Sequence, residues 1–480
     1  MLIISQFRVA CNIDLCYNDK EIYLNSKNLF VTETVSSMKI QLSDHFTAKR
    51  LFRFVIPSVI MMIFTSIYGV VDGFFVSNYA GKTQFAAVNL IFPFIMLISA
   101  IGFMAGTGGS ALVSKTLGEG DRKRANGLFS MIVYAVLILG IVFSLIAQLI
   151  LKKIAVLLGA DALMLKYCVI YGRISFISMP FFMLQNVFQS FFVTAQKPHF
   201  GLFVTVLAGV ANMFLDFLFV GVFKWGVDGA AAATAVSEFI GGGVPLIYFF
   251  TKNTSLLRLG KAVIDFKALG KTCTNGASEL MTNVSMSLVN MIYNKRLMSF
   301  FGQNGIAAYG VIMYVNLIFL SAFIGYSIGV APIIGYNYGA KNDDELKNMF
   351  KKSIVTISFS AVLMFAAGQL LSPVISKIFT GYDAELYALT KHAFRLFATS
   401  YLICGFNIFG SAFFTALNNG GVSAIISFSR TLLFQIATVF LIPLIFGKNS
   451  IWLSITAAEA ATLIVTITFL ITNKKKYNYI

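Results

Sequence analysis

The chain has 480 residues, of which 58% are hydrophobic and only 12% are charged, with a formal net charge of +17 and a mean hydropathy of +0.80. A water-soluble domain buries at most about three quarters of its surface, so it could not cover this much apolar side chain. The basic residues lie in short loops and form no continuous basic face, which argues against nucleic-acid binding. The composition therefore predicts a protein whose solvent is the lipid bilayer.

The first 48 residues or so are polar and aperiodic, and they contain no apolar run of signal-peptide length. Met38 begins a short polar lead into the first long apolar segment. We expect translation to start at Met38, and the alternative is that residues 1–37 form a genuine N-terminal tail. Mass spectrometry of the N-terminus of the native protein would distinguish the two.

About twelve apolar segments follow, most of them near or above the roughly 20 residues that a helix needs to cross a bilayer. They cover approximately 54–76, 85–114, 128–151, 163–195, 202–223, 229–250, 272–297, 306–335, 350–371, 386–416, 422–446 and 451–471. We expect an all-α polytopic membrane protein. Its predicted parts are an N lobe (49–252), a cytoplasmic linker (253–271), a C lobe (272–473) and a basic cytoplasmic C-terminus (474–480).

Lys and Arg residues favour one set of loops over the other by roughly two to one. Because basic residues near helix ends are retained in the cytoplasm, the bias places both termini on the cytoplasmic side. The expected location is a bacterial-type plasma (inner) membrane.

An internal repeat relates the two halves. A shift of 221 positions brings Gly118 onto Gly339, Glu238 onto Glu459, and the run Phe192-x-Thr194-Ala195 onto Phe413-x-Thr415-Ala416. Each half has an even number of predicted spans, six, so both halves enter the membrane in the same direction. They should be related by a pseudo-twofold axis along the membrane normal, as in transporters that work by alternating access.

Ionisable residues within membrane spans are candidates for function, because burying them costs several kcal/mol unless they face a cavity or a partner. Helical spacing places Asn212 and Asp216 on one face, and Ala230, Thr234 and Glu238 on another. Asp72 lies at a similar depth in the first span. These hard oxygen ligands suit a small alkali cation, and two neighbouring carboxylates in a low-dielectric site also suit reversible protonation.

Each of these residues has a plainer alternative. Asp216 could be a buried acid satisfied by Asn212 and water, and Asp72 could lie at the membrane interface. Thr234 could bond to the preceding carbonyl of its own helix.

Each of the remaining polar candidates also has two alternative roles. Glu238 and Glu459 either face a cleft or serve as partners for amides on neighbouring helices. Glu279 is the other acid of the C lobe, and its alternative is an interfacial position near the cytoplasmic end. Gln185, Asn186 and Gln189 either line a cleft or pack between helices.

The residues carry a resemblance to a known family. The stretch from Ile56-Pro57 to Asp72-Gly73 resembles the first helix of the multidrug and toxic compound extrusion (MATE) family. Gly118-Glu119-Gly120, with its counterpart Gly339-Ala340-Lys341, and the loop Gln196-Lys197-Pro198 are similar to further motifs of that family. The resemblance extends from about Lys49 to Ile471 and is greatest to the DinF/MepA-like branch.

The resemblance implies that organic cations are exported in exchange for H⁺ or Na⁺, with no cofactor besides the coupling ion, by a monomer that is not an enzyme. It assigns a cation site, in which Na⁺ is one possible ligand, to Asp72, Asn212, Asp216, Ala230 and Thr234. Tyr68, Asn186 and Gln189 match positions of the family's N-lobe polar network. We expect Glu238, Glu279 and Glu459 to line the substrate cavity as well. Glu279 only partly matches the C-lobe cation site of another branch, so that site is not transferred.

Two other functions were weighed. A lipid or lipid-linked oligosaccharide flippase of the same superfamily could share the two-lobe plan, and Arg395 and Arg430 would then be candidates for binding an anionic group. A membrane-embedded enzyme has no support, because His45, His199 and His392 lack metal-site spacing and no nucleophile motif is present.

Overall fold

The computed structural model describes residues 40–480, and throughout this range the chain forms helices joined by short loops, without a strand. Residues 42–480 make up one compact unit, to which all of the following refers. The predicted translation start at Met38 lies outside the described residues.

The N lobe contains six spans. They are α3 (Ala48–Phe75) with the π-helical turn η1 (Val76–Ala80), α4 (Lys82–Gly118), α5 (Arg122–Leu157), α6 (Ala162–Thr194), α7 (Pro198–Asp216) with the π-helical turn η2 (Phe217–Val222), and α8 (Val227–Phe250).

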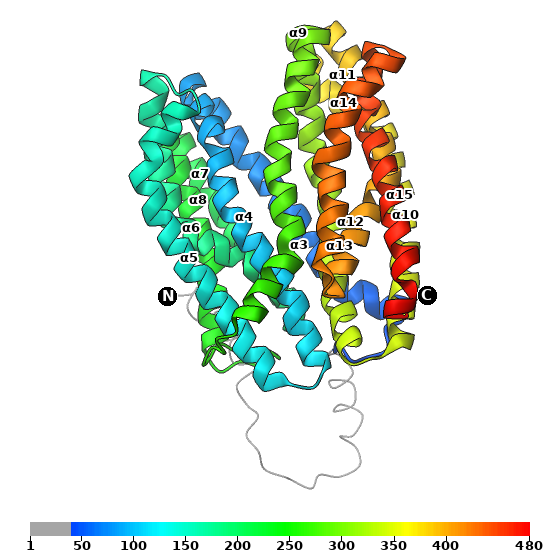
Figure 1. The fold of residues 1–480 in the computed structure, drawn as a ribbon. Helices are drawn as coiled ribbons and strands as arrows, with labels where there is room; N and C mark the ends of the chain where they lie inside the picture. The colour runs from blue at the N-terminus through cyan, green and yellow to red at the C-terminus, as the bar shows by residue number, and fades with distance from the viewer. Residues whose placement is uncertain (1–39) are drawn as a thin grey trace, which may run out of the picture. The chain divides into compact units, whose positions relative to one another are not determined.

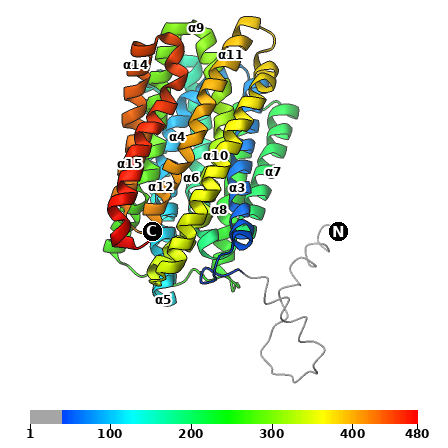
Figure 2. The ribbon, with the colours of Figure 1, turned by 90° about the vertical axis from the view of Figure 1, so that its right-hand side faces the viewer.

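The C lobe repeats this arrangement. It contains α9 (Phe266–Gly339), α10 (Asp343–Thr380), α11 (Ala384–Phe397) with η3 (Ala398–Ser400) and α12 (Tyr401–Ala416), α13 (Gly420–Phe428) with the π-helical turn η4 (Ser429–Leu433) and α14 (Phe434–Phe446), and η5 (Lys448–Leu453) with α15 (Ser454–Tyr477). Figure 2 shows α12 together with α10 and α15, and α12 packs against both of them.

Helix α9 supplies two spans. Its backbone is non-helical at Gly302, with φ 60° and ψ −146°, a conformation that glycine adopts without steric cost. Eleven helical stretches among the described residues are long and apolar enough to cross a membrane, and this break divides one of them. The prediction of an all-α polytopic fold with about twelve spans is confirmed.

The repeat is visible in the backbone, but its register is not uniform. Left-handed glycines recur 221 positions apart, at Gly81 and Gly302 and again at Gly226 and Gly447. Along the fourth and tenth spans, however, the interval is 222, as the N-caps Asp161 of α6 and Asp383 of α11 show. The predicted pairing of Phe192 with Phe413 is therefore wrong by one residue, because the ninth span and its loop contain one residue more than the third.

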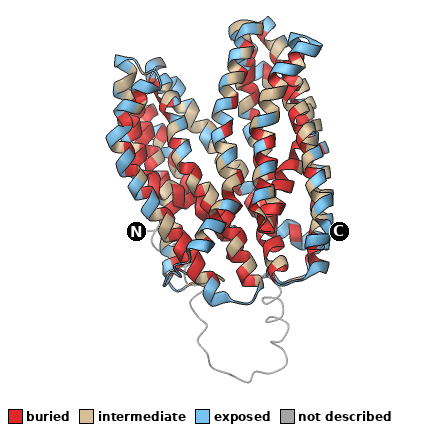
Figure 3. Ribbon diagram, viewed as in Figure 1, coloured by how far each residue is buried: buried red, intermediate tan, exposed pale blue. Residues whose placement is uncertain are grey.

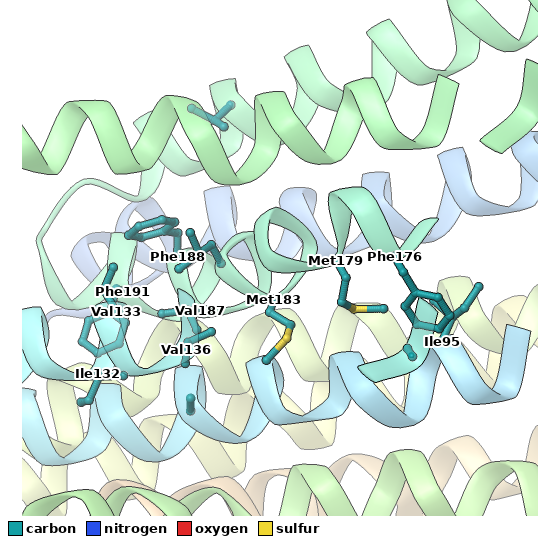
Figure 4. Packing of buried hydrophobic residues seen from close by; sticks show 14 of the residues in the cluster. Ile95, Ile132, Val133, Val136, Phe176, Met179, Met183, Val187, Phe188 and Phe191 are labelled. Atoms are coloured by element: carbon teal, nitrogen blue, oxygen red, sulfur yellow. The ribbon is translucent and has the colours of Figure 1, made fainter. Parts of the chain in front are cut away.

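Each lobe has its own apolar core. In the N lobe, Phe188 and Phe191 of α6 pack with Ile132 and Val136 of α5, and all four side chains are buried (Figure 4). Buried residues concentrate between the helices, whereas exposed residues follow the outer helices (Figure 3). Large apolar side chains such as Leu149 are exposed at this periphery, as expected for a surface that faces lipid.

The two lobes meet where α4 packs against α9, at the lower end in Figure 1, and their ribbons diverge toward the upper end. The contact is reciprocal: the Cα of Gly118 faces the backbone of Tyr336, and the Cα of its repeat counterpart Gly339 faces the backbone of Lys115. Equivalent residues that make equivalent contacts are the signature of a twofold axis, which therefore passes between these two glycines.

The segment before α3 is fixed to the C lobe. Leu42 and Phe46 are fully buried, and Glu345 of α10 accepts hydrogen bonds from the Phe46 amide at 3.0 Å and from Asn348 at 2.8 Å. Glu345 Oε2 also lies 2.6 Å from His45 Nδ1. The first span of the N lobe is thus attached at its start to the other lobe.

Replacing Glu345 with alanine should weaken this attachment. The buried Phe46 amide would lose its acceptor, which typically costs about 1–3 kcal/mol. We expect a lower midpoint of thermal unfolding in detergent. The matched control is Asp344→Ala in the same helical turn, whose exposed side chain should be replaceable without effect. Equal midpoints for the two variants would contradict the assignment.

Candidate functional site

The acids predicted in the first and fifth spans come together. Asp72 of α3 and Asp216 at the end of α7 are close enough for their carboxyl groups to interact directly. Asp216 is fully buried, and neither of its oxygens has a hydrogen-bond partner among the described residues. The hydroxyl of Thr234 in α8 donates to Asp72 Oδ1 at 3.4 Å. Thr234 therefore bonds across helices, not to its own backbone.

Both acids precede π-helical turns. Turn η2 begins at the residue after Asp216, and η1 begins four residues after Asp72, where the Val76 amide is bonded to the carbonyl oxygens of Asp72 and Gly73. Such wide turns are rare in helices and occur mostly at functional sites. The backbone next to the two carboxyl groups thus departs from regular α-helix geometry.

A cavity of about 270 Å³ adjoins this pair inside the N lobe. Its walls come from five helices, α3, α4, α6, α7 and α8. Among the predicted residues, those that line it are Tyr68, Asp72, Asn186, Gln189, Asn212, Thr234 and Glu238.

Several polar atoms at the cavity are buried without a hydrogen-bond partner in the described part of the chain. They are Gln185 Oε1, Asn186 Nδ2, Asn212 Oδ1 and Glu238 Oε2. Buried polar groups are almost always satisfied, so orphaned atoms of this kind indicate a place for water, an ion or a ligand. The lining also includes the aromatic side chains of Tyr68, Phe103 and Tyr171, which come from three different helices.

Not every predicted residue belongs to this site. Ala230 is fully buried and is not part of the cavity lining. Glu279 lines a second, smaller cavity of about 80 Å³ together with N-lobe and C-lobe residues. Of the predicted cavity residues, Glu279 therefore lies apart from those of the N-lobe cavity, and Glu459 lines neither cavity.

Glu459 is held in a hydrogen-bonded network of the C lobe. Its Oε1 accepts from Arg430 Nε at 2.8 Å, and its Oε2 accepts from Asn407 Nδ2 at 2.8 Å. Asn407 Oδ1 in turn accepts from Thr466 at 2.8 Å. For Glu459 the structure favours the alternative that the residue is a partner for an amide on a neighbouring helix.

Sequence reasoning missed part of the α6 wall. Tyr171 and Ser175 line the cavity beside Gln185 and Gln189, and Gln185 donates to the Tyr68 hydroxyl at 3.3 Å. These positions follow one another at helical spacing along a single face of α6. A search for polar periodicity along the whole span could have found them.

A divalent metal site is not indicated. Within residues 40–480, no group of three or more His, Cys, Asp or Glu side chains is arranged to hold a metal ion. The acids of the N-lobe site instead form a pair that is supplemented by amide and hydroxyl groups.

Comparisons with known proteins agree with this architecture. A family model described as MatE matches residues 57–218 and 280–441, one segment in each lobe. The chain is similar to the multidrug export protein MepA of Staphylococcus haemolyticus, with 26% identity over 416 residues that cover 86% of this chain and 90% of that protein. It is also 26% identical over 431 residues to MepA of Staphylococcus saprophyticus subsp. saprophyticus, covering 87% and 93% of the two chains.

Solved structures show the same fold. One is described as the outward-facing conformation of a multidrug resistance MATE family transporter, with a TM-score of 0.86, 22% identity, and coverage of 92% of this chain and 99% of that chain. Another, a MATE in complex with MaL6, gives a TM-score of 0.86 at 21% identity, with coverage of 92% and 100%.

Proposed function

Because the chain belongs to the MatE family of membrane transporters, we propose that it is a secondary active multidrug efflux antiporter that exports organic cations in exchange for H⁺ or Na⁺. It is a multi-pass membrane protein and not an enzyme. The relatives named as multidrug export proteins support the choice of substrate class.

The observation that carries the proposal is the buried carboxyl pair Asp72 and Asp216, in which neither oxygen of Asp216 has a hydrogen-bond partner among the described residues. Two carboxylates cannot both stay ionised at low cost in a low-dielectric site without a cation nearby. Binding of H⁺ to one carboxylate, or of Na⁺ between the two, removes this cost. Thr234, Asn212 and a backbone oxygen near Ala230 would complete the ligand set for Na⁺.

Ion binding drives the cycle through differential affinity, because a ligand shifts a conformational equilibrium only as far as it prefers one state. Neutralising the pair allows α3 to pack more closely on α7 and α8, and the wide turns η1 and η2 are where the backbone can adjust. The ion gradient supplies the free energy for export, and the protein couples ion binding to the conformational change.

The same cavity suits the substrate. Tyr68, Phe103, Tyr171 and Phe182 offer ring faces for a cation, and Glu238 offers a negative charge. An organic cation and the coupling ion then compete for the same negative charge, which is the simplest basis for exchange. Asn186 and Gln189 provide further hydrogen-bonding groups at the cavity wall.

The basic loops support a location in a bacterial inner membrane with both termini in the cytoplasm. In that orientation the α4–α9 contact closes the cytoplasmic side, and the lobes diverge toward the outside, as in an outward-open state. The proposed unit of function is a monomer, because each chain contains both lobes.

Efflux from proteoliposomes tests the proposal. Purified protein is reconstituted with ethidium, and transport is followed under an imposed proton gradient, an imposed sodium gradient or no gradient. Gradient-driven efflux identifies the coupling ion. No transport under either gradient, from correctly inserted protein, would contradict the proposal.

The flippase alternative is weaker. Arg430 is paired with Glu459 at 2.8 Å, so its charge is not free for an anionic headgroup. Arg395 donates to Ser372 at 3.2 Å. The lining of the N-lobe cavity is acidic, and no Lys or Arg belongs to it in the part of the chain that the structure describes, which favours a cation.

A further inference from the structure

The two lobes carry the same acid in different surroundings. Glu238 follows the left-handed Gly226 by the same interval as Glu459 follows Gly447, so the two glutamates are repeat counterparts. Both are buried, with exposed fractions of 8% and 2%. Glu238 lines the N-lobe cavity, whereas Glu459 lines neither cavity, although its partners Asn407 and Arg430 line the smaller one.

The neighbouring amides are counterparts as well. Gln185 follows the capping Asp161 by the same interval as Asn407 follows the capping Asp383. In the C lobe, Asn407 donates to Glu459 at 2.8 Å. In the N lobe, Gln185 Oε1 and Glu238 Oε2 are buried without a partner among the described residues.

One difference between the lobes is the aspartate pair, because the counterparts of Asp72 and Asp216, counted from the same glycines, are Tyr293 and Ala437. The difference at the two glutamates is a cation. Arg430 Nε donates to Glu459 Oε1 at 2.8 Å, and its side chain is only 14% exposed. Counted from the landmarks on either side, its position in the N lobe corresponds to Ala208 or Gly209, neither of which carries a charge. The N lobe therefore has the acid and the amide but lacks the guanidinium.

The absence of this guanidinium from the N lobe has an electrostatic consequence. A lone carboxylate inside a membrane protein is costly, and a paired one is far less so. The C lobe satisfies this requirement with a side chain of its own. The N lobe, with Asp72, Asp216 and Glu238, has to obtain a cation from solution.

We propose that Arg430 is a tethered cation that holds, beside Glu459 in the C lobe, the place that a mobile cation takes beside Glu238 in the N lobe, so that Glu459 is withheld from ion coupling. The proposal rests on the proposed coupling function. It identifies Arg430 as a residue that determines how many ions are exchanged in each cycle. Arg430 lies in the π-helical turn η4, and the π-helical turns η1 and η2 likewise lie beside Asp72 and Asp216.

The prediction is that removing Arg430 converts Glu459 into an acid that responds to ions. The experiment uses the full chain in detergent with the three acids of the N lobe neutralised by Asp72→Asn, Asp216→Asn and Glu238→Gln, so that only the C lobe is tested. Thermal unfolding is measured in sodium chloride against choline chloride at equal ionic strength, and at mildly acidic against mildly alkaline pH. Three proteins are compared: this background, the background with Arg430→Ala, and the background with Arg430→Ala and Glu459→Gln.

We expect the background to melt at a midpoint independent of Na⁺. With Arg430→Ala the midpoint should fall, and it should be raised again by Na⁺ or by acid. With Glu459→Gln added, the midpoint should recover and lose this response. A role of Arg430 in packing alone would lower the midpoint without making it depend on ions.

The groups that face Glu459 are Arg430 of η4 and Cys404 and Asn407 of α12, and Glu279 of α9 interacts with the same guanidinium. Cys404 and Glu279 are present in every variant. A response to ions that survives Glu459→Gln would therefore belong to one of them and would overturn the assignment to Glu459.

Failure to fold is also informative. If the Arg430→Ala protein aggregates in all ion conditions while the double C-lobe variant folds, no mobile cation can replace the guanidinium, and the proposal is overturned. If both aggregate, Arg430 acts through packing, with the same conclusion. The proposed function is tested separately, because the ion response of the wild-type protein depends on the N-lobe pair.

Discussion

Asp216→Asn is expected to slow the efflux of ethidium driven by an ion gradient, while the protein remains folded and inserted. Asparagine keeps the shape of the side chain but removes one charge of the buried pair, so Asp72 no longer needs a cation to offset its neighbour. The ion then loses its preference for one conformation. Coupling free energies between sites are typically 1–3 kcal/mol, so we expect a loss of about 5- to 150-fold in gradient-driven rate.

The matched control is Asp228→Asn. Asp228 lies in the first turn of α8, close in sequence to Thr234, but its side chain is exposed and outside the cavity. This variant should transport like the wild type. Unchanged coupling in Asp216→Asn, measured under the gradient that drives the wild-type protein, would remove the carboxyl pair from the mechanism.

Gly276→Ala should have an effect of similar size through a different cause. The Cα of Gly276 in α9 packs on the backbone of Met104 in α4, and an added Cβ would collide with the Met104 carbonyl. Backbone cannot move aside as a flexible side chain can, and overpacking of this kind costs about 1–3 kcal/mol. The collision destabilises the conformation in which α4 and α9 are in contact.

We therefore expect the conformational equilibrium to move away from cytoplasmic closure and transport to slow by roughly tenfold or more. Cys273 is half-buried next to this contact. Its labelling by a membrane-impermeant maleimide from the cytoplasmic side, measured by mass spectrometry of its peptide, should increase.

Gly270→Ala is the control for this change. Gly270 lies in the same helix, but no atom lies within 4 Å of the position that a Cβ would take. Both substitutions improve intrinsic helix propensity by about 1 kcal/mol, so a loss seen only at position 276 comes from the contact between helices. Equal transport by the two variants would show that this contact does not limit the cycle.

The helices could be predicted because a segment that inserts into a membrane has an apolar local composition. A span must be apolar over its own length, so each of the twelve segments was visible without knowledge of its neighbours. The exact ends were not, since helices such as α5 (Arg122–Leu157) continue past the apolar stretch into charged residues. Long basic side chains can extend to the interface, so charge alone does not end a helix.

The site was predicted in part. Asp72, Asp216 and Thr234 were recognisable because a polar group in an apolar span is exceptional. Their proximity is a property of how α3, α7 and α8 pack, and the sequence contains no direct record of that packing. The uncharged wall formed by Tyr171 and Ser175 was missed for a different reason, since each residue is unremarkable by itself and only its helical spacing with Gln185 and Gln189 indicates a shared face.

The repeat counterparts Glu238 and Glu459 show most clearly what could not be predicted from the sequence. From the sequence, Glu238 and Glu459 were equivalent members of a repeat, and both were placed in the substrate cavity. The tertiary structure gives Glu459 an arginine and an amide as partners and leaves Glu238 Oε2 without one. Composition and periodicity thus determined the all-helical membrane fold and its internal repeat, because these depend on each residue's own affinity for lipid. Only the packing of helices decided which acids are free to bind a cation, because that depends on partners far away in the chain.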